Sequence, residues 1–137
     1  MALTILDAGV VIGGLEDNNV HHVPARAAMD TAVQRGDVLL LPTSAYAEVM
    51  VGPAHNGPAA MARIDTALDF ADIAIVPADR DIAREAARLR AKHRSLRLPD
   101  ALVIATAITL DADHLLTTDR AWKRLRNLGV RGLTVVG

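Results

Sequence analysis

Short runs of branched or leucine-rich apolar residues recur along the chain, and longer alanine-rich segments separate them. Each run has the length of a strand that is buried on both faces, as the strands of a parallel sheet are. We therefore predict strands at Leu3–Leu6, Val38–Leu41, Ile73–Val76, His114–Thr117 and Leu133–Val136.

The segments between these runs carry the spacing of amphipathic helices. Residues 79–93 show it most clearly, because apolar and basic side chains fall on opposite faces there. The inward residues are Ile82, Ala86 and Leu89, and the outward ones are Arg84, Arg88 and Lys92. Asp79 or Asp81 can cap this helix, and Pro99 suits the first turn of the next one.

Strands that alternate with helices predict an α/β fold. We expect one domain over residues 1–137, with a parallel sheet of four to five strands and helices on both faces. The length of 137 residues and the 51% of hydrophobic residues are sufficient for a single buried core.

Composition and the start of the chain narrow the class of protein. The absence of cysteine excludes disulfides and thiolate metal sites, and it fits a reducing cytoplasm. No apolar run approaches the roughly 18–20 residues that cross a bilayer, and the first residues lack the basic start of a signal peptide. We therefore expect a cytoplasmic protein that does not enter a membrane.

Charge divides the chain into an acidic and a basic half. Residues 1–83 hold 4 of the 15 Lys and Arg and 11 of the 16 Asp and Glu, so their net charge is −7. Residues 84–137 carry a net charge of +6. A basic half is typical of a chain that binds an anionic partner, although charged outer faces of helices give the same count.

Four carboxylates stand where an α/β fold places its functional site, beyond the carboxyl ends of the strands. Asp7 follows the first predicted strand and Asp119 follows the fourth. Glu48 lies in the helix after the second strand, and Asp100 opens an apolar helix. Turn and capping roles also explain Asp7, Asp100 and Asp119, whereas Glu48 has apolar neighbours that make such a role hard to assign.

If these acids converge, they favour one kind of metal and one kind of chemistry. Four carboxylates without His or Cys select Mg²⁺ or Mn²⁺ over zinc. Such a site suits phosphodiester hydrolysis, in which the metal activates a water and neutralises charge on the phosphate. The five histidines show no metal-ligand spacing, so we expect them at the surface or in turns.

The order of these motifs resembles the PIN-domain family across essentially the whole chain. Its length and spacing resemble the VapC ribonucleases, which are the toxins of VapBC toxin–antitoxin pairs. The most specific parts are Leu98–Ala107, which begins Leu-Pro-Asp-Ala, and Leu115–Trp122, which contains Leu-Leu-Thr-Thr-Asp-Arg-Ala-Trp. Many family members carry Ser or Thr near Ala8–Gly9, where this chain lacks a hydroxyl.

The resemblance implies a catalytic and metal-binding set with supporting hydroxyl groups. The set is Asp7, Glu48, Asp100 and Asp119, and the supporting residues are Thr117 and Thr118. The resemblance also implies an Mg²⁺-dependent ribonuclease that forms a homodimer and is silenced by a cognate antitoxin.

Basic and apolar side chains outside this set supply further hypotheses. Basic residues beside a nuclease site can contact the RNA backbone, and we predict this role for Arg84, Arg88, Lys92, Lys123, Arg124 and Arg126. A mean hydropathy of +0.23 predicts apolar surface for a dimer interface and for a partner's amphipathic segment. Our candidates for that surface are the Val49–Val51 run and the face of Met61, Ile64 and Leu68.

We therefore expect an Mg²⁺- or Mn²⁺-dependent endoribonuclease that is the toxin of a type II toxin–antitoxin system. Two other functions stay open. One is a noncatalytic PIN-like module that binds RNA or protein. The other is a phosphoryl-transfer or receiver-like protein that uses Asp7, although Asp7-Ala8-Gly9 lacks the second Asp that a dehalogenase-like motif needs.

Overall fold

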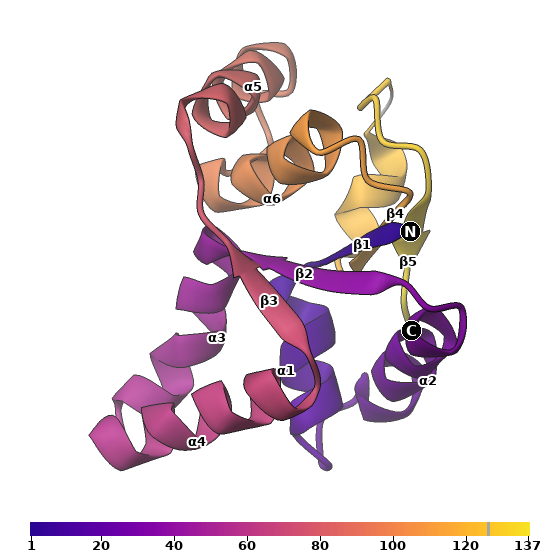
Figure 1. Ribbon diagram of the computed structural model, residues 1–137. Helices are drawn as coiled ribbons and strands as arrows, with labels where there is room; N and C mark the ends of the chain where they lie inside the picture. The colour runs from indigo at the N-terminus through magenta and orange to yellow at the C-terminus, as the bar shows by residue number, and fades with distance from the viewer. Residues whose placement is uncertain (126) are drawn as a thin grey trace.

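Five parallel strands form one sheet through the middle of the molecule, in the order β3-β2-β1-β4-β5 (Figure 1). The computed structural model describes residues 1–125 and 127–137. The strands are β1 (Leu3–Leu6), β2 (Val38–Pro42), β3 (Ile73–Val76), β4 (His114–Thr117) and β5 (Leu133–Val135). The sequence prediction of the strands is confirmed to within one residue.

Helices cover both faces of this sheet, as predicted (Figure 1). On one face lie α1 (Ala8–Leu15), α2 (His22–Gln34), α3 (Thr43–Ala54) and α4 (Pro58–Phe70). On the other face lie α5 (Arg80–Lys92) and α6 (Leu98–Thr109), which pack against each other. A short 3₁₀ helix, η1 (Arg120–Arg124), follows β4. In the part of the chain that the structure describes, no helix is long and apolar enough to cross a bilayer.

The order of the strands reverses between β1 and β4. From β1 the chain moves outward to β2 and β3, and α5 and α6 then return it to β4 on the other side of β1. Leu6 and Leu116 are partners in this central pair. The residues just after β1 and β4 therefore meet at the position where open parallel sheets bind their ligands.

The core is formed around the central strands, and the edge strands are less covered. Ile5, Leu6 and Leu115 are fully buried. In β3, by contrast, Ala74 and Ile75 are exposed. The prediction that all five strands are buried on both faces is therefore wrong for the edge strands β3 and β5, whose faces are covered only in part.

Helix α5 confirms the pattern that predicted it. Ile82, Ala86 and Leu89 are its buried residues, and Asp79 caps it by accepting a hydrogen bond from the N–H of Ile82 at 2.9 Å. His55 is exposed, and His21, His22, His93 and His114 are half-buried, so all five histidines reach the surface. The expectation of exposed apolar surface at Val49–Val51 is wrong for two of its residues. Val49 and Met50 belong to the buried interior, so only Val51 of that run is exposed.

Candidate metal-binding active site

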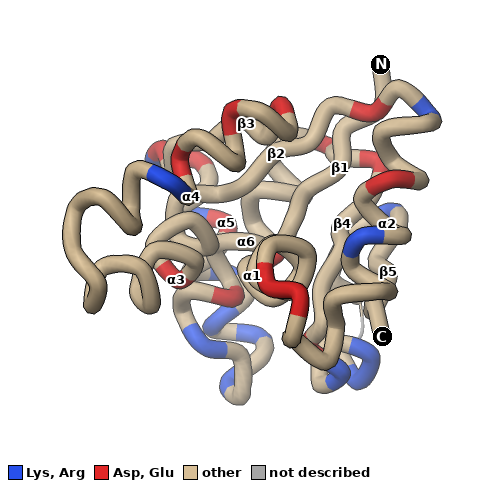
Figure 2. Tube along the Cα trace, turned by 90° about the horizontal axis from the view of Figure 1, so that it is seen from below, with Lys and Arg blue, Asp and Glu red and all other residues tan. Residues whose placement is uncertain are grey.

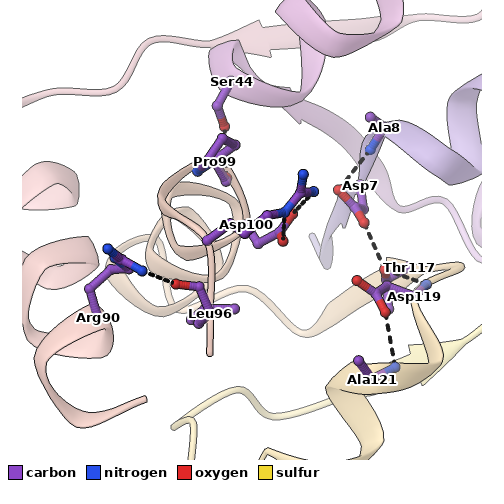
Figure 3. A network of polar contacts seen from close by, with 11 residues as sticks. Asp7, Ala8, Ser44, Arg90, Leu96, Pro99, Asp100, Thr117, Asp119 and Ala121 are labelled. Atoms are coloured by element: carbon purple, nitrogen blue, oxygen red, sulfur yellow. Dashed lines mark hydrogen bonds and ion pairs between the residues drawn. The ribbon is translucent and has the colours of Figure 1, made fainter. Parts of the chain in front are cut away.

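Asp7 and Thr117 meet where the order of the strands reverses. The Thr117 hydroxyl donates to Oδ2 of Asp7 at 2.7 Å, and the N–H of Ala8 donates to Oδ1 at 2.9 Å (Figure 3). Asp7 is only 8% exposed, and it also caps α1. Among the residues that the structure describes, no basic side chain pairs with it. Hydrogen bonds therefore fix the orientation of this buried carboxylate, and no basic side chain of the described residues neutralises its charge.

Burial raises the pKa of Asp7 to about 6. The hydrogen bonds from Thr117 and Ala8 act in the opposite direction, and the negative charges of Asp100 and Glu48 raise the pKa further. The negative charges of both acids therefore act on the Asp7 carboxylate.

Glu48 reaches this region from α3, which begins directly after β2. Burial raises the pKa of Glu48, the charge of Asp100 raises it further, and Arg97 opposes the shift. The hydroxyl of Ser44 donates to the carbonyl of Pro99 at 3.3 Å, which joins the start of α3 to the start of α6. This contact holds the helices that carry Glu48 and Asp100 beside each other.

Asp100 lies in the first turn of α6 and is 8% exposed. Oδ2 of Asp100 accepts a hydrogen bond from Nε of Arg97 at 3.2 Å. A guanidinium N–H of Arg90 donates to the carbonyl of Leu96 at 2.6 Å and so ties the preceding loop to α5. Arg97 was not predicted as a site residue, although it stands three residues before Asp100 at a helix start, which is a usual spacing of a helical ion pair.

Asp119 follows β4 and is half-buried. Its backbone N–H donates to the Thr117 hydroxyl at 3.1 Å, and its Oδ1 caps η1 by accepting from the N–H of Ala121 at 2.9 Å. Thr117 therefore contacts both Asp7 and Asp119. Asp7 and Asp119 both cap helices, as the sequence allowed. Capping positions both carboxylates at the same edge of the sheet.

Thr118 lies against α1 at Gly9. A Cβ on Gly9 would collide with the Thr118 hydroxyl oxygen, so this close approach requires glycine. A serine or threonine at position 9 would compete for the same space. The threonine hydroxyl after β4 thus occupies the place where a side chain at position 9 would otherwise lie.

The donor set fits a hard divalent cation, although its side chains do not form a finished cage. Asp7, Asp100 and Asp119 reach one region from β1, α6 and the segment after β4 (Figure 3). No three acidic or histidine side chains of the described residues lie close enough together to hold a metal ion as they stand. Like charges repel one another, and carboxylates that lack nitrogen or sulfur partners suit Mg²⁺ or Mn²⁺. A divalent ion would offset the burial, and the smaller repulsion, that raise the pKa of Asp7.

Basic residues gather along one side of the molecule, seen at the lower edge of Figure 2. The outward residues of α5, Arg84, Arg88 and Lys92, are exposed, as are Lys123 and Arg124 on η1. Arg126 lies outside the described residues. A cavity of about 180 Å³ lies beside Asp100 and Asp119, and its lining includes Trp122 of η1.

The sequence matches the family model of the PIN domain over residues 4–128. No curated protein matches the chain. PIN domains are typically nucleases and generally bind Mg²⁺ or Mn²⁺.

Solved structures of toxin–antitoxin systems share the fold. VapBC2 from Rickettsia felis, bound to a DNA fragment from its promoter, has a TM-score of 0.75 and 15% identity over 98% of this chain and 99% of that chain. A toxin–antitoxin complex from Klebsiella pneumoniae has a TM-score of 0.70 and 24% identity over 98% and 97%. VapC20 of Mycobacterium tuberculosis, a toxin that cleaves the sarcin–ricin loop, has a TM-score of 0.70 and 11% identity over 93% and 98%. With the family model matched over most of its length, the chain belongs to the PIN-domain family.

Proposed function

We propose that this chain is an Mg²⁺- or Mn²⁺-dependent endoribonuclease and the toxin of a toxin–antitoxin pair. One observation carries the proposal. Asp7 is a buried carboxylate at the reversal of strand order, it has no cation partner among the described residues, and its pKa is raised toward neutrality beside Glu48 and Asp100. A buried carboxylate without a basic partner is costly, and carboxylates with raised pKa values are typical of sites that bind a cation or carry out a reaction.

Each side chain of the site has a role in this proposal. Asp7, Glu48, Asp100 and Asp119 would hold the metal, which supplies an activated water and neutralises charge on the phosphate. Thr117 orients Asp7 through its hydroxyl and Asp119 through the backbone N–H. Burial and the charge of Asp100 raise the pKa of Glu48, and a bound cation would lower it again.

Cleavage of RNA by the purified chain tests the activity. We expect total RNA to be cut in Mn²⁺ or Mg²⁺ and left intact in chelator, with no release of phosphate from a generic phosphomonoester. Release of phosphate from the monoester alone would favour an Asp7-based phosphoryl-transfer enzyme. Binding of RNA without cleavage would favour the noncatalytic module.

The solved relatives from toxin–antitoxin complexes support the proposed partner, an antitoxin encoded beside the gene. Because Val49, Met50 and Leu68 are buried, we propose a different surface for a partner or a second copy. Phe70 of α4 is 91% exposed and Val33 of α2 is 56% exposed, and both line an apolar cavity of about 430 Å³. Such exposed apolar surface is typical of a protein interface.

Association has its own test. Light scattering at micromolar concentration should give the mass of a homodimer, and the neighbouring antitoxin should suppress cleavage. A monomer whose activity ignores that antitoxin would contradict the toxin assignment and leave the nuclease assignment standing.

A further inference from the structure

Arg97 is the one basic side chain that pairs with any of the four site acids among the described residues. Its Nε lies 3.2 Å from Oδ2 of Asp100, and a second guanidinium nitrogen lies 3.5 Å from Oδ1. The Arg97 side chain is 70% exposed, whereas that of Asp100 is 12% exposed. The pair therefore joins a buried acid to a cation that remains largely in solvent.

The contact is loose for its type. Hydrogen bonds between a guanidinium and a carboxylate are commonly about 2.7–2.9 Å long, shorter than either contact here. Water screens a pair whose cation is so exposed, so little free energy opposes its separation. Arg97 can leave Asp100 without breaking any other polar contact that the structure shows for its side chain.

The other acids of the site also act on the Arg97 guanidinium. Its pKa is raised by the hydrogen bond to Asp100 first, then by the charge of Asp100, with smaller contributions from Glu48 and Asp119. A divalent ion among these acids would take over Asp100 and repel the guanidinium. One such ion would still leave two of the four negative charges uncompensated, and an RNA phosphate needs a further positive charge beside it.

The space beside Arg97 fits a part of the substrate. The cavity of about 180 Å³ is lined on one side by Arg97 and Asp100, and on the other by residues of the Asp119–Leu125 segment. Leu96, Trp122 and Leu125 give it an apolar wall. Its volume is below the roughly 300–1,000 Å³ of a pocket for a drug-sized ligand, so it suits a small part of a substrate.

We infer that Arg97 binds the phosphate at which RNA is cut, and that Asp100 holds it until the metal displaces it. The inference rests on the proposed function and adds a residue that neither the motif nor the four acids supply. A guanidinium suits this role because its planar fork matches two phosphate oxygens at once. The cavity would then receive the nucleotide next to that phosphate.

Two measurements on the full chain separate this role from a purely structural one. In Arg97→Ala, calorimetric titration with Mn²⁺ alone should show binding about three- to tenfold tighter, because a competing positive charge is gone. In the same variant, kcat/KM for single-stranded RNA should fall about 10- to 100-fold, because a charged hydrogen bond to phosphate is lost. Arg97→Lys should recover part of kcat/KM through its point charge.

Arg94→Ala is the matched control, since Arg94 is an exposed arginine of the same loop. It should leave both quantities within about twofold. Weaker Mn²⁺ binding in Arg97→Ala would mean that Arg97 only orients Asp100, and it would overturn the inference. So would an Arg97→Ala protein that behaves like the Arg94→Ala control. A wild-type chain that neither binds Mn²⁺ nor cuts RNA would overturn the proposed function as well.

Discussion

The two edges of the sheet use aspartate in opposite ways. At the amino edge, Asp37 directly precedes β2 and accepts hydrogen bonds from the Thr4 hydroxyl at 2.8 Å and from Arg35 at 2.7 Å. The hydrogen bond from Arg35 holds the pKa of Asp37 below its usual value. At the carboxyl edge, burial and neighbouring acids raise the pKa of Asp7.

The same contrast extends to the neighbouring acids. Asp113 directly precedes β4 and accepts a hydrogen bond from the N–H of Leu3 at 2.9 Å, while Asp111 pairs with Arg131 at 2.8 Å. These contacts tie the starts of strands together, so the amino-edge acids stabilise the fold. Among the described residues, the carboxyl-edge acids have one basic partner, Arg97, which pairs loosely with Asp100. A fold tolerates such an edge where the charges serve a ligand.

Substitutions at the two edges should differ most in their effect on RNA cleavage. Asp7→Asn and Asp100→Asn should each lower metal-dependent RNA cleavage roughly a thousandfold, because stabilisation by the metal is worth several kcal/mol. Asp111→Asn, at the opposite edge, should leave the rate unchanged. Initial rates on one RNA substrate measure all three. Full activity of Asp7→Asn would remove Asp7 from the site.

The pH dependence of stability should follow the raised pKa of Asp7. Its pKa is 3.8 ordinarily and about 6 in the folded chain, so folding favours the protonated form. The stability that this shift contributes is fully present below about pH 4 and is lost as the pH rises past about 6, a change of about 3 kcal/mol at most. Urea unfolding in chelator, at several pH values, measures it.

Asp7→Asn is the reference for that experiment, because asparagine does not titrate. As the pH rises from about 4 to 8, the free energy of unfolding of the variant should increase relative to that of the wild type. If the difference in free energy of unfolding between the two proteins does not change with pH, the pKa of Asp7 is not raised in the folded chain.

Stability at neutral pH should respond oppositely at the two edges. Asp37→Asn loses a charged hydrogen bond to Arg35 and should destabilise the chain by about 1–3 kcal/mol. Asp7→Asn relieves repulsion and should leave the chain equally or more stable. Denaturant midpoints at pH 7 compare them. Equal destabilisation by both substitutions would contradict the contrast between the edges.

The smallest effect concerns affinity for RNA. Neutralising Arg84, Arg88 and Lys92 on α5, or Lys123 and Arg124 on η1, should weaken binding evenly across sequences. The salt dependence should flatten by about one unit for each lost phosphate contact. Filter binding over a range of salt concentrations measures the slope. An unchanged slope would make these residues ordinary solvated surface.

Much of the fold could be predicted because its signals are local. Runs of apolar residues marked the strands, and the alternation of apolar and basic positions marked α5. The exposure of Ile75 could not be predicted, because the position of β3 at the edge depends on the whole strand order. The burial of Val49 and Met50 depends likewise on how α3 packs.

The site divides in the same way. Asp7, Asp100 and Asp119 could be found because each follows a strand or opens a helix, and Glu48 because it lies among apolar neighbours. The contacts of the opposite edge could not, since Thr4 and Asp37, or Leu3 and Asp113, are far apart in the sequence and meet only in the folded sheet. Arg97 was the exception that local spacing could have revealed, because it lies one helical turn before Asp100.

Direct titration with Mn²⁺ tests the central claim, that the carboxyl-edge acids form a metal site. Calorimetry at pH 7 should show saturable binding to the wild-type chain and to Asp111→Asn. Asp7→Asn should bind at least about tenfold more weakly, because it removes a charged oxygen ligand. Saturable binding that is equal in the wild type and Asp7→Asn, or no binding to the wild type, would contradict the account.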